Sequence, residues 1–193
     1  MTCNIIHEEN YPTVGELFFE KAKKYKNNIA ITSLSQDVTY SQLLQVIKKI
    51  LLMIDELEIS KGDVISVIGE QSVEFISVFI SILSSKATLL SIDPNLPINR
   101  KLLMLNESKS KFLFVLTSQD DEFITEVKEQ LTIELIILNR EKLLNFSKNK
   151  DTRMIIRAQS QSPAYIFFTS GSTGKPKGIL GKHNSLSHFL VWQ

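Results

Sequence analysis

The residues Ala-Tyr-Ile-Phe-Phe-Thr-Ser-Gly-Ser-Thr-Gly-Lys-Pro-Lys-Gly occupy positions 164–178 of the chain. The first five of them form an apolar run with aromatic and β-branched side chains, which is typical of a buried β-strand. The remaining ten are hydroxyl-bearing residues, glycines, lysines and one proline. The chain has only seven glycines, and four of them lie between residues 171 and 181. The stretch therefore predicts a strand that runs directly into a polar, glycine-rich loop.

The side chains of this loop suit a negatively charged ligand. Its donors are the hydroxyl and ammonium groups of Thr169, Ser170, Ser172, Thr173, Lys175 and Lys177. Gly171 and Gly174 have no Cβ, so they allow backbone N–H groups to approach an anion closely. Each hydrogen bond to a charged oxygen contributes roughly 1.5–3 kcal/mol. Several such bonds would hold the phosphate groups of a nucleotide, and we expect this role for the loop.

The charge distribution points to the same segment. The chain has 22 basic and 21 acidic residues, hence a formal charge of +1. Residues 152–193 contain no Asp or Glu and carry +5, which leaves −4 for residues 1–151. A local anion site and a mobile, accidentally basic surface linker are both compatible with this composition. A Walker A loop is excluded because Pro176 follows Lys175, and no Gly-x-Gly-x-x-Gly fingerprint occurs.

Apolar runs and helical patterns alternate along the rest of the chain. Apolar runs predict strands at 64–68, 88–92, 112–116, 133–138 and 164–168, with shorter β-prone runs at 29–32 and 38–40. Capping residues and helical periodicity predict helices over 14–26, 40–54, 73–85, 97–108, 120–130 and 183–192. Residues 141–162 are expected to be an irregular connector. The predicted fold class is α/β, a mainly parallel sheet flanked by helices, without a clear internal boundary in residues 1–193.

The composition excludes several classes of protein. The small net charge argues against nucleic-acid binding, and Cys3, the single cysteine, rules out an internal disulfide. Residues 1–10 lack a secretory pattern, and the longest apolar run, 75–85, is shorter than the roughly 20 residues that cross a membrane. We therefore expect a cytoplasmic protein that binds no membrane. His183 and His188 have no Cys, Asp or Glu nearby, so we expect helix packing and no metal site.

Residues 169–178, Thr-Ser-Gly-Ser-Thr-Gly-Lys-Pro-Lys-Gly, resemble the signature loop of the adenylate-forming (AMP-binding) superfamily without a gap. That superfamily includes acyl-CoA synthetases, luciferases and the adenylation domains of nonribosomal peptide synthetases. Weaker similarities to the peptide synthetase version follow in order at 38–43, 83–94 and 181–192. The resemblance covers residues 11–193 and indicates the N-terminal part of a nonribosomal peptide synthetase adenylation domain.

The resemblance implies a ligase that uses ATP to activate a carboxylate, with an amino acid as the expected substrate. The carboxylate attacks the α-phosphate, pyrophosphate leaves, and the acyl-adenylate passes to a thiol, commonly the phosphopantetheine of a carrier protein. By position, the implied ATP-binding residues are Thr169, Ser170, Gly171, Ser172, Thr173, Gly174, Lys175, Lys177 and Gly178. Mg²⁺ accompanies ATP in this superfamily, and its ligands are expected outside this chain. No residue matches the catalytic lysine of the superfamily, and Lys182 is not assigned to that role.

Members of this superfamily extend far beyond the signature loop. We therefore expect residues 1–193 to form a partial adenylation domain that lacks the substrate pocket core and the C-terminal lid domain and is inactive alone. A truncated gene, a split subunit and a fragment of a longer polypeptide are all compatible with the sequence. The alternatives are an acyl-CoA synthetase-type fragment, a non-catalytic remnant or interaction subunit that keeps the fold, and an unrelated nucleotide-binding module.

Overall fold

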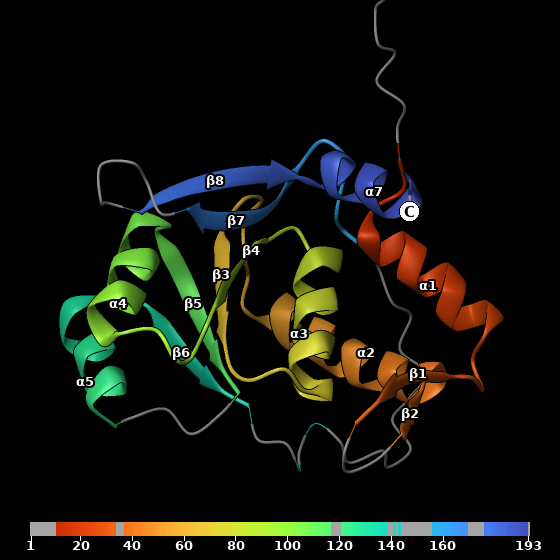
Figure 1. Cartoon of the computed structure of the whole chain (residues 1–193), viewed down its shortest axis with the longest axis horizontal. Coiled ribbons are helices and arrows are strands. Elements are labelled where there is room, and N and C mark those ends of the chain that lie inside the picture. Colours follow the sequence, from red (N-terminus) through yellow and green to blue (C-terminus); the bar gives the residue numbers. More distant parts are fainter. Residues whose placement is uncertain are drawn as a thin grey trace, which may run out of the picture.

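A six-stranded sheet with the strand order β6-β5-β3-β4-β7-β8 forms the centre of the molecule. The computed structural model describes residues 11–33, 37–116, 121–138, 141, 143, 156–169 and 176–192. The strands are β3 (Val64–Ile68), β4 (Thr88–Ile92), β5 (Ser110–Val115), β6 (Glu134–Ile137), β7 (Pro163–Thr169) and β8 (Lys177–Lys182). All of them are parallel except β8, which pairs antiparallel with β7 at the edge of the sheet (Figure 1). The predicted α/β fold with a mainly parallel sheet is confirmed.

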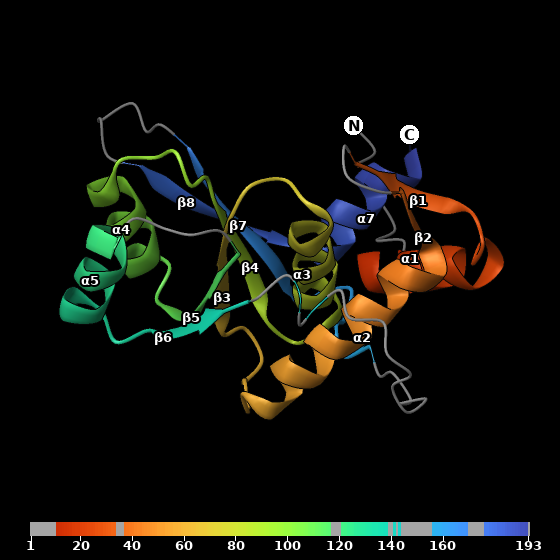
Figure 2. The same cartoon turned by 90° about the horizontal axis from the view of Figure 1, so that it is seen from below.

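Helices cover both faces of this sheet (Figure 2). They are α1 (Val14–Lys24), α2 (Tyr40–Glu56), α3 (Val73–Ser84), α4 (Ile98–Glu107), α5 (Asp121–Gln130) and α7 (His183–Trp192). α2 and α3 pack on one face, and α4 and α5 pack on the other. A separate antiparallel pair, β1 (Ile29–Thr32) and β2 (Asp37–Thr39), lies beside α2. Helices on both faces explain why the strands have continuous apolar runs.

Short-range hydrogen bonds begin the first three helices at the predicted residues. The Thr13 backbone N–H donates to Glu16 Oε2 at 2.7 Å, and the Glu16 N–H donates to Thr13 Oγ1 at 3.3 Å. Thr39 and Gln42 form the same reciprocal pair at the start of α2. Ser72 caps α3 with its hydroxyl group. These side chains satisfy groups that the first helical turn leaves unpaired, so the sequence encodes the helix starts locally.

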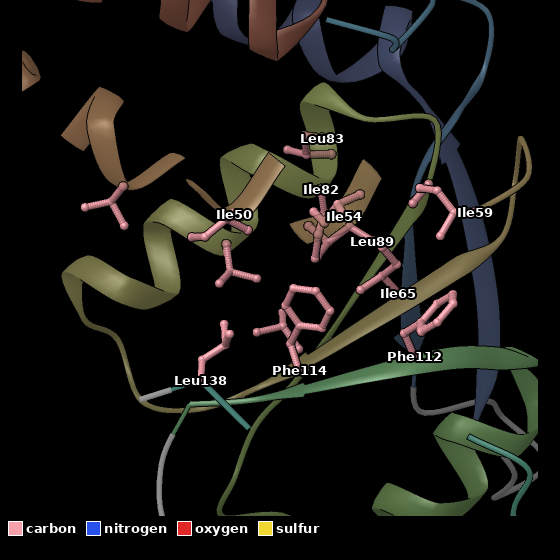
Figure 3. Close-up of a cluster of buried hydrophobic side chains, with 14 of the residues drawn as sticks. Ile50, Ile54, Ile59, Ile65, Ile82, Leu83, Leu89, Phe112, Phe114 and Leu138 are labelled. Atoms are coloured by element: carbon pink, nitrogen blue, oxygen red, sulfur yellow. The ribbon is translucent and has the colours of Figure 1, made fainter. Parts of the chain in front are cut away.

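The largest hydrophobic core lies between the sheet and helices α2 and α3 (Figure 3). In this view Ile54 of α2 and Ile82 of α3 point toward Phe114 of β5. All residues of β3 are buried. A second core on the opposite face contains Leu105 of α4 and Phe123 of α5. The two cores hold the sheet between the helices.

Two segments differ from the sequence-based prediction. The sequence predicts a polar loop up to Gly178, whereas Lys177 and Gly178 form the first two residues of β8. They pair with Thr169 and Phe168 of β7, and this pairing outweighs their low intrinsic preference for a strand. Leu143, predicted to lie in an irregular connector, is buried in the first core.

Candidate functional site

Thr169 and Lys177 stand at the two ends of the segment that the sequence predicts to bind phosphate. Thr169 is the last residue of β7, and Lys177, the first residue of β8, is its pairing partner. The Thr169 hydroxyl donates a long hydrogen bond of 3.5 Å to the Lys177 carbonyl oxygen, and both residues are exposed. The predicted site residues that lie outside the described part of the chain are Ser170, Gly171, Ser172, Thr173, Gly174 and Lys175. Of the predicted set, the structure therefore brings together Thr169, Lys177 and Gly178.

This pair lies at the carboxyl edge of the parallel strands. β4 and β7 are parallel neighbours that pair at Leu89 with Tyr165 and at Leu90 with Ile166, and Asp93 directly follows the last residue of β4. Asp93 begins a tight turn, in which its Oδ1 accepts from the Asn95 backbone N–H at 2.9 Å and from the Asn95 side-chain amide at 3.1 Å. In open α/β sheets, ligands bind outside the carboxyl ends of the strands. The connection between β7 and β8 therefore emerges where this class of fold binds ligands.

The electrostatics of β8 favour an anion at its first residue. Lys177 and Lys182 are exposed at the two ends of the strand, and Lys182 Nζ donates to Gln161 Oε1 at 3.5 Å. Among the described residues, no carboxylate forms an ion pair with Lys177, and residues 152–193 contain no Asp or Glu. An ammonium group without a fixed counter-ion can neutralise a phosphate without first breaking an ion pair. Lys182, at the far end of the same strand, provides a matched control for Lys177.

Packing explains one of the two glycines of β8 and not the other. A Cβ on Gly178 would lie 3.4 Å from side-chain atoms of Ile166 and Phe168, which is an acceptable packing distance. A Cβ on Gly181 would lie 2.1 Å from the ring of Tyr165, so a larger residue there would require that ring to move. The predicted site includes Gly178 and leaves out Gly181. The described packing gives Gly181 a structural role and imposes no requirement at Gly178.

Comparison with known proteins assigns the family. The model of the family described as AMP-binding enzyme matches residues 18–193. The chain belongs to the AMP-binding enzyme family. Bacitracin synthase 1 of Bacillus licheniformis is 28% identical to this chain, and the match covers 93% of the chain. The NpsA N-terminal subdomain of Klebsiella oxytoca covers 93% of the chain with a TM-score of 0.75 at 18% identity. NpsA-ThdA, an artificially fused adenylation–PCP di-domain nonribosomal peptide synthetase from the same organism, covers 93% with a TM-score of 0.73 at 20% identity.

This member of the AMP-binding family spans only a part of the proteins it matches. It covers 3% of bacitracin synthase 1, 44% of the NpsA subdomain chain and 34% of the di-domain chain. The two solved structures show that the fold is shared. Together with the sequence match, they confirm the resemblance to the adenylation domains of nonribosomal peptide synthetases that the sequence motifs indicate.

His183, the first residue of α7, is a buried packing residue in this AMP-binding fold. Burial lowers the pKa of its imidazole to about 4, and the nearby Glu16 carboxylate opposes that shift. Its backbone N–H donates to the Ser162 carbonyl oxygen at 3.1 Å. Within the described ranges, no three His, Cys, Asp or Glu side chains gather into a possible metal site. The same ranges contain no helix with the length and apolar character required to cross a bilayer.

Sequence reasoning missed a patch of exposed apolar side chains on β7 and β8. Phe167, Ile179 and Leu180 are each more than half exposed, although apolar strand residues ordinarily indicate a core. The sequence does contain a signal for this patch, which is the apolar pair Ile179 and Leu180 between Gly178 and Gly181. Two adjacent apolar residues of a strand point to opposite faces, and a glycine on either side leaves them little cover from their own strand.

Proposed function

We propose that this chain supplies the phosphate-binding part of an enzyme that uses ATP to activate a carboxylate, an amino acid, as an acyl-adenylate. The pairing of Thr169 with Lys177 at the carboxyl edge of the sheet carries the proposal, because this pair frames the hydroxyl- and glycine-rich segment. Membership of the AMP-binding enzyme family supports it. In the proposed reaction a carboxylate oxygen attacks the α-phosphorus of ATP. The bond from that phosphorus to the pyrophosphate oxygen breaks as the new bond forms.

The proposed contacts follow from the charge of the triphosphate. The hydroxyl groups that donate to phosphate oxygens are those of Thr169, Ser170, Ser172 and Thr173. The glycines that let the backbone approach the phosphates are Gly171, Gly174 and Gly178. Lys175 and Lys177 offset the negative charge that grows on the departing pyrophosphate, so their effect is larger in the transition state than in the bound substrate. No catalytic residue is assigned within this chain.

Magnesium accompanies ATP in the proposed reaction, where it would screen the charge of the phosphate oxygens. Among the described residues, no three His, Cys, Asp or Glu side chains gather into a group that could hold a metal ion, and the magnesium ligands are proposed to lie outside this chain. No step is therefore assigned to a metal held by this chain.

A carrier protein with a phosphopantetheine arm is the proposed acceptor of the activated acyl group. The thiolate sulfur attacks the acyl carbon, a thioester forms, and AMP leaves with the electron pair of the broken bond. The similarity to an adenylation–PCP di-domain supports this kind of partner. The chain alone is proposed not to complete the reaction, since it covers 44% of the NpsA subdomain chain.

A thermal-shift measurement with matched lysine variants tests the proposed function. We expect Mg-ATP and pyrophosphate each to raise the Tm of the chain. Lys177→Ala removes a charged hydrogen bond worth roughly 1.5–3 kcal/mol and should weaken binding by about tenfold or more. Lys182→Ala changes the charge equally but lies at the other end of β8, so it should keep the wild-type shift.

Two results would count against the proposal. One is an equal ligand-induced Tm shift for wild type and Lys177→Ala, which would remove the phosphate role of Lys177. The other is robust amino-acid-dependent ATP–pyrophosphate exchange by the purified chain, which would show that it is competent alone.

A further inference from the structure

Two buried polar atoms of α7 have no hydrogen-bond partner among the described residues. They are Nδ1 of His183 and Oγ of Ser187. The two residues are 1% and 0% exposed, so neither side chain lies at the molecular surface. Buried polar groups of native proteins are ordinarily hydrogen-bonded, either to the protein or to ordered water. Two such atoms on one short helix therefore point to a ligand that both of them contact.

The spacing of the two residues places both side chains on one side of α7. His183 is the first residue of the helix, and Ser187 follows four residues later. Residues four apart in a helix lie on the same face, one turn from each other. Helix α7 packs against β7, β8 and α1, and Figure 1 shows it between the end of β8 and α1. Because both side chains are buried, they face this packed side of the helix.

The Ser187 hydroxyl does not use the acceptor that buried serines of α3 use. In α3 the hydroxyl groups of Ser77, Ser81 and Ser84 each donate to the carbonyl oxygen four residues earlier at 2.7 Å. The equivalent acceptor for Ser187 is the carbonyl oxygen of His183, and Ser187 Oγ makes no such bond. The Ser187 hydroxyl is therefore directed away from its own helix backbone and into the interior.

The surroundings of the two atoms select a neutral ligand over an ion. Burial keeps the pKa of His183 at about 4, so its imidazole is neutral near pH 7, and the Glu16 carboxylate that acts on it would repel an anion. The first two backbone N–H groups of α7, which could otherwise bind an anion, already donate to the carbonyl oxygens of Ser162 and Ser160.

A bound cation would lack ligands at the same place. In the part of the chain that the structure describes, no three His, Cys, Asp or Glu side chains come together. A small neutral molecule that both donates and accepts hydrogen bonds satisfies the two atoms without adding a charge to the interior.

We propose that a single buried water molecule binds on the packed side of α7 and bridges His183 Nδ1 and Ser187 Oγ. A neutral imidazole nitrogen donates or accepts according to its tautomer, and a hydroxyl group does both, so water can match either arrangement. A bridging water is enthalpically nearly as favourable as a direct hydrogen bond. The water removes the cost of burying two polar atoms without partners and so stabilises the packing of the helix that follows β8.

Oxygen-17 relaxation dispersion of the solvent, measured with the complete chain, tests the proposal. The method counts water molecules that stay bound for longer than the protein takes to tumble. It follows the oxygen of water itself, so exchange of hydroxyl protons cannot imitate a bound water. We expect Ser187→Ala to lower the number of long-lived waters by about one per chain. The matched control is Ser77→Ala, which removes an equally buried hydroxyl that donates to the Val73 carbonyl oxygen, and it should leave the number unchanged.

Thermal unfolding of the same variants gives a second readout, in which the sign of the change decides. A buried hydroxyl with no partner at all is destabilising, so without the water Ser187→Ala would raise the Tm. With the water, the substitution removes one of its two anchors and leaves His183 Nδ1 without a partner, so the Tm should fall by a few degrees. His183→Asn keeps a polar atom close to the position of Nδ1 and should retain the long-lived water.

Three outcomes would overturn the proposal. The first is an equal number of long-lived waters in wild type and Ser187→Ala. The second is a higher Tm for Ser187→Ala than for wild type, which would show that the hydroxyl has no partner of any kind. The third is an equal loss of water in Ser77→Ala, which would assign the effect to the truncation of any buried serine. Phosphate binding plays no part at this site, so a chain that fails the ATP thermal-shift test can still pass this one.

Discussion

Burial of a single imidazole, that of His183, links the stability of the fold to pH. The side chain is 1% exposed, and burial lowers its pKa to about 4 in spite of the nearby Glu16 carboxylate. An unfolded chain holds its histidines at a pKa of about 6.5. Between these two values the unfolded state binds more protons than the native state. The stability contributed by neutral His183 is therefore complete above about pH 7 and is lost as the pH falls toward 4.

His183→Gln removes this titration and should flatten the pH dependence of stability. The difference between a pKa of about 6.5 and one of about 4 corresponds to about 3 kcal/mol of unfolding free energy. We expect the urea midpoint of the wild-type chain to fall more steeply between pH 7 and about pH 4 than that of the variant. His188→Gln changes an exposed histidine of the same helix and should retain the wild-type slope. Parallel slopes for wild type and His183→Gln would contradict the assignment.

The residue types in the loop were sufficient to predict an anion site. They did not show which side chains surround each residue. The hydroxyl groups and lysines of residues 169–177 predict phosphate binding from chemistry alone. Gly181 and Gly178 look equivalent in the sequence. Only the structure shows that the ring of Tyr165, 16 residues away in the chain, lies against Gly181, where a Cβ would be 2.1 Å from it. The roles of residues 170–175 stay a prediction.

At the scale of elements, α1 packs closely against α3 because residue 15 is a glycine, which has no side chain. Gly15 is buried, and a Cβ there would lie 2.6 Å from Ser84 Oγ and 3.0 Å from Ser84 Cβ. The Ser84 hydroxyl donates to the Ile80 carbonyl oxygen at 2.7 Å, which holds it in this position. The two helices can therefore approach each other this closely only with glycine at position 15.

Gly15→Ala should destabilise the fold although it improves helix propensity. Alanine in a helix ordinarily gains roughly 0.5–1 kcal/mol over glycine. Overpacking against Ser84 opposes this gain and costs roughly 1–3 kcal/mol. We expect a net loss of about 1 kcal/mol of unfolding free energy in urea denaturation. Adding Ser84→Gly removes both colliding atoms and should recover part of the loss, whereas a Gly15→Ala chain more stable than wild type would show that α1 shifts freely.

Elements that depend on local signals could be predicted, and one that depends on pairing with a neighbouring strand could not. β3 and β4 occupy the predicted residues, 64–68 and 88–92, because continuous apolar runs fit a sheet covered on both faces. Thr13 and Thr39 begin their helices as the capping patterns predict. β8, by contrast, has two glycines and two lysines in six residues. Its pairing with β7 decides its conformation.

At the scale of the whole molecule, the strand order depends on contacts between segments far apart in the sequence. β3 lies in the interior of the sheet, with β4 on one side and β5 on the other. Periodicity identifies parallel strands but contains no information about which strands are neighbours. The sequence alone therefore predicts a loop at the edge of a parallel sheet, and only the structure shows that β7 lies beside β4.

The basic part of the chain lies at one edge of the sheet. Residues 152–193, with a charge of +5, include β7, β8 and α7. The proposed phosphate contacts lie at the Lys177 end of β8.

A titration of the isotope-labelled chain with pyrophosphate, followed by nuclear magnetic resonance, tests the phosphate-binding claim most directly. We predict saturable amide shifts concentrated in residues 169–178 and at Asp93 and Asn95, in the turn that follows the neighbouring strand β4. Lys177→Ala should weaken the apparent affinity about tenfold or more, and Lys182→Ala should leave it unchanged. Saturable shifts confined to other parts of the chain, or no saturable shift at all, would contradict the claim that phosphate binds at the carboxyl ends of the parallel strands.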